Sequence, residues 1–194
     1  MDRLPQTFTT SQHGKNTTAY QFYNNVILRN IFCSHIRLGR FGKAQPIIEE
    51  AIRLKMAFYG NNDVEVADSL HKLGIVFVSK NNFGSALQTF HRALRIYRSA
   101  SELSQISEII FKIGCIHFQI NEFMAALMAF EEAMDIEQSL HIDGKPTDGR
   151  AEILCHLAFV KIKLKQYGDA IIFLEEALSV SSLMRCQKLK SLLI

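Results

Sequence analysis

The sequence has no tryptophan, and among its 194 residues there are only three prolines and ten glycines. Hydrophobic residues make up 48% of the chain and charged residues 21%. This balance differs from the polar, proline-rich composition of disordered chains. We therefore expect a folded chain with a substantial core, of the size of one compact domain or one repeat array.

Long apolar runs are also lacking. No stretch approaches the roughly 20 apolar residues that a membrane-spanning helix needs. The first 18 residues contain no apolar core of the kind found in signal peptides. The four cysteines form neither a Cys-x-x-Cys pair nor a disulfide framework. These absences predict free thiols in a reducing compartment, so we expect a cytoplasmic protein with no membrane span.

Excess charge of one sign is confined to one end of the chain. Basic residues number 22 and acidic residues 19. The difference of three equals the contribution of Arg185, Lys188 and Lys190 in the last twelve residues, which contain no acid. Residues 1–182 are therefore neutral overall. Since nucleic-acid binders concentrate positive charge on one face, we expect no nucleic-acid partner.

Motifs for catalysis, cofactors and metals are missing as well. Cys33 and His35 are two residues apart, as are Cys115 and His117, and such pairs point to different faces of a helix. No glycine-rich loop has the phosphate-binding pattern. We therefore expect no catalytic, cofactor-binding or metal-binding residues and no enzymatic activity. A Cys–His nucleophile pair assembled from different helices is an alternative that the sequence alone leaves open.

An internal repeat is the dominant feature of what is present. Four aromatic residues lie 42, 40 and 44 residues apart and begin four similar segments. Each is followed by Ala three residues later, by a large residue seven later and by Ala ten later. The aromatic residues are Phe41, Phe83, Phe123 and Tyr167; the first alanines are Ala44, Ala86, Ala126 and Ala170; the large residues are Ile48, Phe90, Phe130 and Leu174; the second alanines are Ala51, Ala93, Ala133 and Ala177. Repeats with periods of 20–50 residues indicate a solenoid or a related array.

A second helical pattern precedes each of the last three aromatic residues. Leu70, Leu73, Gly74 and Phe77 are spaced to form one apolar face of a helix, and units three and four carry similar sets. Short polar links such as Lys80–Asn82 then connect this first helix (helix A) to the second (helix B). The run Gly74–Val78 could pass for a strand by propensity, but the repeat register favours a helix. We predict an all-α fold: a right-handed α-solenoid of about four antiparallel helix hairpins.

The pattern resembles the tetratricopeptide repeat (TPR). That signature is large–large–small–aromatic in helix A, then aromatic–Ala–large–Ala in helix B, and the resemblance covers roughly residues 25–182. In unit two the matching residues are Leu70, Leu73, Gly74, Phe77, Phe83, Ala86, Phe90 and Ala93. The period exceeds the usual 34 residues and is similar to the long-period repeats of kinesin light chains, which also carry a pair like Val66-Ala67. The first unit departs from the pattern at Phe32 and Pro46.

The resemblance implies a non-enzymatic scaffold that holds peptides in a concave groove lined by helix A. It places residues with apolar side chains at i, i+4 and i+7 in that groove, between charged residues at its rim. The predicted groove residues are Arg29, Arg37, His71, Ile75, Val78, Glu108, Phe111, Cys115, Phe118, Phe159, Ile162 and Lys163. The expected ligand is an apolar peptide or an amphipathic helix. The alternative is that tight curvature of the solenoid, or the chain's own N-terminal segment, buries this stripe.

The predicted domain organisation has three parts. Residues 1–18 form a flexible lead and residues 19–182 the repeat domain, with units at about 25–62, 67–102, 107–142 and 151–182. Residues 183–194 form a capping helix or a truncated further repeat, and self-association through this segment is a further alternative. The alternative function, from a different class, is a structural subunit held in a larger or self-associated complex. The sequence identifies neither the partner nor the pathway.

Overall fold

The computed structural model describes residues 28–140 and 147–192. The predicted lead at 1–18, the start of the first unit and the last two residues therefore lie outside the described residues. The described chain is helical throughout and contains no strand. A helix over residues 28–37 precedes α2 (Phe41–Tyr59), α3 (Val64–Ser79), α4 (Phe83–Ala100), α5 (Leu103–Gln119), α6 (Phe123–Leu140), α7 (Asp148–Lys163) and α8 (Tyr167–Leu192).

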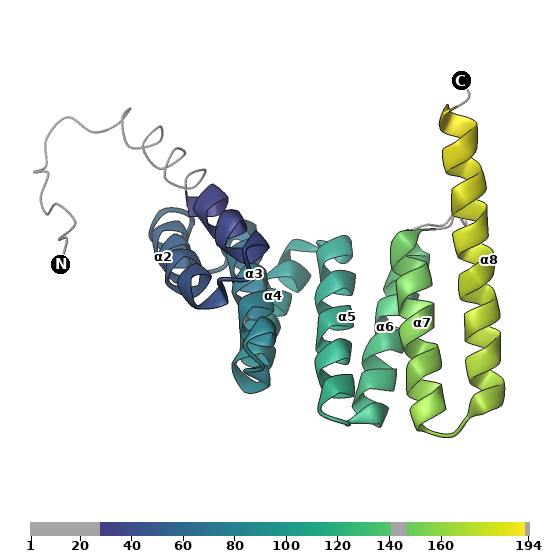
Figure 1. The fold of residues 1–194 in the computed structure, drawn as a ribbon. Helices are drawn as coiled ribbons and strands as arrows, with labels where there is room; N and C mark the ends of the chain where they lie inside the picture. Colours follow the sequence, from purple (N-terminus) through teal and green to yellow (C-terminus); the bar gives the residue numbers. More distant parts are fainter. Residues whose placement is uncertain (1–27, 141–146, 193–194) are drawn as a thin grey trace, which may run out of the picture.

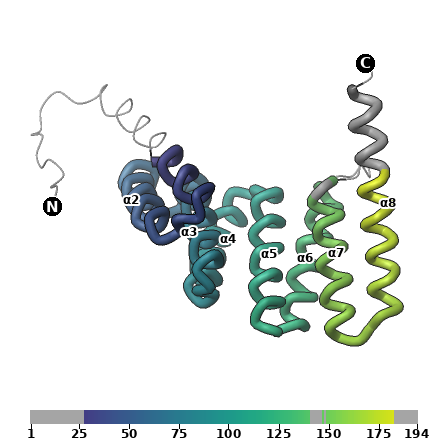
Figure 2. Tube along the Cα trace, viewed as in Figure 1, coloured from purple at the N-terminus to yellow at the C-terminus, as the bar shows by residue number. Residues whose placement is uncertain are grey.

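The helices pair in sequence order into hairpins that stack into an elongated array (Figures 1 and 2). Within hairpins, α3 packs on α4, α5 on α6, and α7 on α8. Between hairpins, α2 packs on α3, α4 on α5, and α6 on α7. Helices B begin at the four aromatic residues that define the repeat, and Gly74–Val78 lies inside α3. The predicted all-α solenoid of helix hairpins is confirmed.

The turn between helix A and helix B has the same backbone geometry in all four units. The residue two positions before helix B has a left-handed backbone conformation. Its φ is 65° at Gly39, 56° at Asn81, 65° at Asn121 and 62° at Lys165. In each turn the next amide donates to the carbonyl five residues back, as in Asn82 to Phe77 at 2.9 Å. This closes the helix A end with a Schellman-type bond. Gly and Asn suit this position, whereas Lys165 adopts it at a steric cost.

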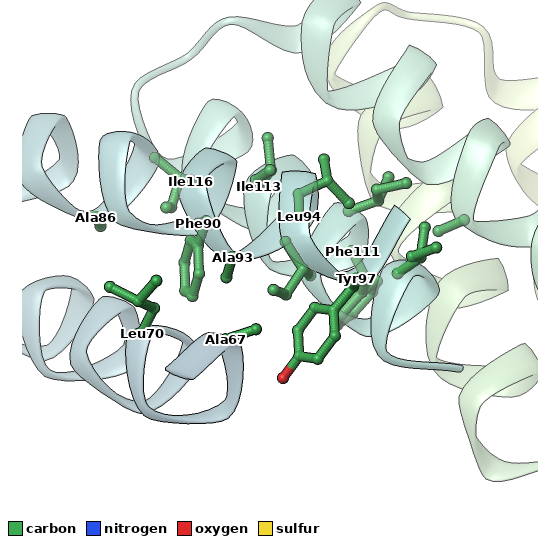
Figure 3. Packing of buried hydrophobic residues seen from close by; sticks show 14 of the residues in the cluster. Ala67, Leu70, Ala86, Phe90, Ala93, Leu94, Tyr97, Phe111, Ile113 and Ile116 are labelled. Atoms are coloured by element: carbon green, nitrogen blue, oxygen red, sulfur yellow. The ribbon is translucent and has the colours of Figure 1, made fainter. Parts of the chain in front are cut away.

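Within units two and three, a glycine of helix A lies directly under a phenylalanine of helix B. A Cβ added at Gly74 would lie 2.3 Å from Cε1 of Phe90, and one at Gly114 would lie 2.7 Å from Cε1 of Phe130. Both phenylalanines are fully buried. In Figure 3 the Phe90 ring points toward Leu70 and Ala67, with Ile113 and Ile116 of the next helix A on its other side. The missing side chain therefore determines how closely the two helices approach.

Unit one reaches a similar core with different residues. Phe32 stands where the other units have a small residue, and it is 5% exposed; Ile48 replaces the helix B phenylalanine and is 4% exposed. Pro46 lies inside α2 without ending the helix.

The end of the array differs from the predicted organisation. Residues 183–192 do not form an element of their own but continue α8 without a break. At 26 residues α8 is eight residues longer than α4 or α6, and it projects beyond α7 (Figure 1). Its role as a cap or as the start of a further repeat stays a prediction.

The contact between Gly74 and Phe90 makes a size prediction. We expect Gly74→Ala to lower the free energy of unfolding by about 1–3 kcal/mol, because the new methyl group overlaps a ring that cannot move into solvent. This outweighs the roughly 0.5–1 kcal/mol that Ala gains over Gly in a helix. The measurement is urea unfolding followed by circular dichroism.

Gly84→Ala is the matched control, because a Cβ at Gly84 meets nothing within 4 Å. That variant should be neutral or slightly stabilised. Adding Phe90→Leu to Gly74→Ala, which approximates the Ala158 and Leu174 pair of unit four, should restore part of the loss. Equal stability of Gly74→Ala and Gly84→Ala would contradict the size constraint.

Candidate functional site

The helix A surfaces of units two to four carry an apolar row. It is formed by residues at two register-equivalent positions, Ile75 and Val78 on α3, Cys115 and Phe118 on α5, and Phe159 and Ile162 on α7. Helices α5 and α7 contact each other across the intervening α6, so the helices A are neighbours in this part of the array. Because these residues are three apart along each helix, they share one face.

Accessibility of the apolar row increases toward unit four. Ile75, Val78, Cys115 and Phe118 are half-buried. Phe159 is 48% exposed and Ile162 is 39% exposed. The ring of Phe118 packs edge-to-face on Phe123 at the start of helix B, with 5.7 Å between the ring centroids. The row therefore combines half-buried, packed side chains in unit three with exposed side chains in unit four.

Two of the predicted groove anchors are core residues instead. Phe111 is 6% exposed and His71 is 9% exposed. Phe111 packs on Phe130 of its own hairpin at 5.5 Å and under His156 of the next hairpin at 4.9 Å between ring centroids. Stacking of the hairpins covers this position, so Phe111 and His71 lie in the junctions between units, and their contact with a ligand stays a prediction.

His156 had no predicted role. It stands where α3 and α5 carry Lys72 and Lys112, so the repeat register gave no reason to expect a ring contact. The structure places its ring against Phe111 and also 5.3 Å from Phe130. The only sign of this ring contact in the sequence is that a histidine lies next to a groove position of helix A. That sign does not predict a ring contact specifically.

The predicted charged residues lie at the surface. Arg29, Arg37, Glu108 and Lys163 are all exposed. Arg29 lines a depression of about 270 Å³ between units one and two. Glu108 lines one of about 330 Å³ between α5 and α7. The four residues are thus placed around the helix A surface, in different units, and do not form one cluster.

Polar contacts join neighbouring helices, both within unit two and between units one and two. The Tyr97 hydroxyl donates to Asp68 Oδ1 at 2.5 Å. Burial, together with the adjacent Asp68 carboxylate, raises the pKa of Tyr97 above its usual range. Lys55 is buried and its Nζ lies 2.7 Å from Glu65 Oε2, which holds the pKa of Glu65 below its ordinary value. These groups have structural partners and are not free to react.

His71 lies at the junction of units two and three. Its ring packs on Phe90 with 5.8 Å between centroids, and its Nε2 lies 3.7 Å from Glu108 Oε1. Burial lowers the pKa of His71, although the carboxylates of Glu108 and Asp68 act in the opposite direction. The residue therefore serves as a neutral core ring that faces charges of the next unit.

No group of three or more His, Cys, Asp or Glu side chains within 28–140 and 147–192 is arranged as a metal site. Cys33 is an exposed free thiol, and Cys115 and Cys155 are half-buried free thiols. Burial raises the pKa of the Cys115 thiol to about 11, which makes it a poor nucleophile near neutral pH. None of the helices in the described part of the chain is both long and apolar enough to cross a bilayer.

Stacked antiparallel hairpins, with a glycine of helix A against a phenylalanine of helix B in units two and three, define the class as an α-solenoid. Two tetratricopeptide repeat family models match residues 34–99 and 151–190, which together make up more than half of the chain. The chain belongs to the tetratricopeptide repeat family.

Solved structures confirm the fold at low sequence identity. BtubC (BKLC) from P. vanneervenii is 19% identical, with a TM-score of 0.75 over 83% of this chain and 64% of that one. The apo form of RapI is 13% identical, with a TM-score of 0.74 over 87% of this chain and 59% of that one. MamA is 14% identical, with a TM-score of 0.62 over 87% of this chain and 84% of that one. This chain thus spans less than two thirds of BtubC and RapI. No curated protein sequence matches it.

Burial of His71 predicts a pH effect on stability. The folded state takes up a proton at His71 less readily than the unfolded state, whose histidine pKa is about 6.5. Stability should be full above that pH and should fall as the pH drops below it. We expect the melting temperature to decrease between about pH 7.5 and 5.5.

His71→Phe introduces the residue that unit three has at the equivalent position. In this variant the melting temperature should fall less between about pH 7.5 and 5.5 than in the wild type. His91→Gln, at an exposed position on α4, is the control. If His71→Phe and the wild type lose stability in parallel as the pH falls, His71 does not cause the effect.

Proposed function

We propose that this chain is a non-enzymatic protein-interaction scaffold that binds an apolar peptide or an amphipathic helix on its helix A surface. The single observation that carries the proposal is the exposure of Phe159 and Ile162 in register with the half-buried Cys115 and Phe118. Exposed apolar side chains that lie together on one face are costly in water unless a ligand covers them. Membership of the tetratricopeptide repeat family supports the same function.

The shape of the apolar row favours a helical ligand. Its residues come from the second halves of three neighbouring helices, so they present separate apolar side chains and no backbone edge. An amphipathic helix offers apolar residues at i, i+3, i+4 and i+7 and can place one between each pair of helices A. A strand that adds to a sheet has no place to bind on this surface.

The charges beside the apolar row are of both signs. Glu108 and Glu152 are exposed on α5 and α7, while Lys163 is exposed at the end of α7. Charges at the rim of a binding surface determine ligand orientation and association rate more than they determine affinity. We therefore expect the ligand's apolar residues to supply most of the binding free energy and its flanking charges to fix its direction.

The test uses a displayed library of peptides of about four helical turns, selected on the wild-type chain. Selected peptides should share apolar residues at helical spacing. The double variant Phe159→Glu/Ile162→Glu should weaken their binding by tenfold or more, since each buried apolar side chain contributes about 1.5–3 kcal/mol and about 1.4 kcal/mol is tenfold. Binding is measured by fluorescence anisotropy.

Met128→Glu is the matched control, because Met128 is 68% exposed on the outer side of α6 and lies away from the apolar row. It should leave the affinity unchanged. All variants should first show the helicity and melting temperature of the wild type. Peptides that bind the double variant as well as the wild type would place the ligand site elsewhere.

The alternative function, a structural subunit of a self-associated or larger assembly, is favoured by a different observation. The last helix exposes apolar residues that do not belong to the apolar row, and these are the basis of the next inference.

A further inference from the structure

One side of α8 exposes a continuous apolar stripe at the end of the array. Tyr167 is 60% exposed, Ile171 56%, Leu174 39% and Leu178 72%. Steps of four, three and four residues put these side chains on one side of the helix. We call this stripe the end face.

The same positions are covered in the inner hairpins. On α6, the equivalents of Ile171, Leu174 and Leu178 are Leu127, Phe130 and Met134, which are 7%, 0% and 7% exposed. On α4, the equivalents of Leu174 and Leu178 are Phe90 and Leu94, which are 0% and 6% exposed. In each case the hairpin's own helix A and helix A of the following hairpin cover them, as α5 covers α4 and α7 covers α6.

The end face therefore has the composition of an internal junction, but no helix follows it in the described residues. The neighbouring Ile172 gives a contrast on the same helix. It is 63% exposed, and its equivalents Gln88 and Met128 are exposed too, so that position is ordinary outer surface. Only the end face departs from the pattern of the inner units.

The first helix of a second copy is a poor match for the end face. In α3, α5 and α7 the position that meets the preceding helix B holds Val76, Ile116 and Val160, which are at most 1% exposed. In the helix over 28–37 this position holds Ser34, an exposed hydroxyl that donates to Asn30. A second position of this junction holds Leu73, Ile113 and Leu157 in the inner units, all buried, and in the first helix it holds Ile31, which is 42% exposed. The first helix is therefore polar at one of the two positions at which head-to-tail stacking would require an apolar side chain.

The end face is instead complementary to itself. α8 is 26 residues long, about 39 Å, so a second α8 is long enough to cover the whole stripe. Antiparallel pairing also keeps Lys165, which lies before the stripe, away from its own copy.

We propose that the end face is a homodimer contact in which α8 packs antiparallel against α8 of a second copy. The contact is isologous, so it closes on itself and does not propagate into a filament. It leaves the apolar row of the helix A surface free, and it does not depend on the proposed ligand-binding function.

The test is sedimentation equilibrium of the full chain over a micromolar concentration series. We expect a reversible monomer–dimer equilibrium, with dissociation constants at least tenfold higher for Ile171→Glu and for Leu178→Glu. Ile172→Glu is the matched control, since it makes the same change at a similar exposure one residue away, and it should leave the equilibrium unchanged. Circular dichroism confirms folding of each variant.

A photo-crosslinking amino acid at position 174 tests the arrangement. Crosslinks between two copies of α8 support the antiparallel dimer. Crosslinks from α8 to residues 28–37 would replace it with head-to-tail stacking. A chain that stays monomeric throughout the series would overturn the proposal and leave the end face to a helix of another protein. Equal effects of Ile171→Glu and Ile172→Glu would overturn it as well.

Discussion

The size match between one residue of helix A and one of helix B is the contact on which the rest of the structure depends. Where helix A has glycine, helix B has phenylalanine; where helix A has alanine, helix B has leucine; and where helix A has phenylalanine, helix B has isoleucine. The pairs are Gly74 with Phe90, Gly114 with Phe130, Ala158 with Leu174, and Phe32 with Ile48. Close-packed interiors tolerate little change in volume, so in units two and three, where the glycine lies directly against the ring, the pair sets how near its two helices lie. That distance in turn determines how the next hairpin stacks.

Stacking divides the helix A surface into two functional parts. Near the first half of each helix, side chains of one unit are covered by the next, as His156 covers Phe111 and Glu108 approaches His71. Near the second half, no described side chain covers Phe159 or Ile162 to the same degree. The first part holds the array together, and the second carries the surface on which we propose that a ligand binds.

Repeat register predicts most of the fold because it reports environments that recur. It identifies helices, turns and the small-residue contact, and the polar link Lys80–Asn82 is a turn as expected. It fails where a position's surroundings depend on its place in the array. The resemblance places Phe111, Phe118 and Phe159 in one groove, yet of these three only Phe111 has a ring from the next hairpin packed against it. The end face on α8 was missed for the same reason, since its residues match those buried in inner units.

Nearly all contacts in the described chain join helices that are adjacent in sequence, apart from the smaller contact of α5 with α7. No single contact holds such an array together, because its stability is the sum of the stabilities of the repeats and of the interfaces between neighbouring repeats. Pulled from its two ends, it would therefore extend hairpin by hairpin rather than rupture at one force. Each hairpin at an end of the array has only one neighbouring hairpin to stabilise it, whereas each inner hairpin has two.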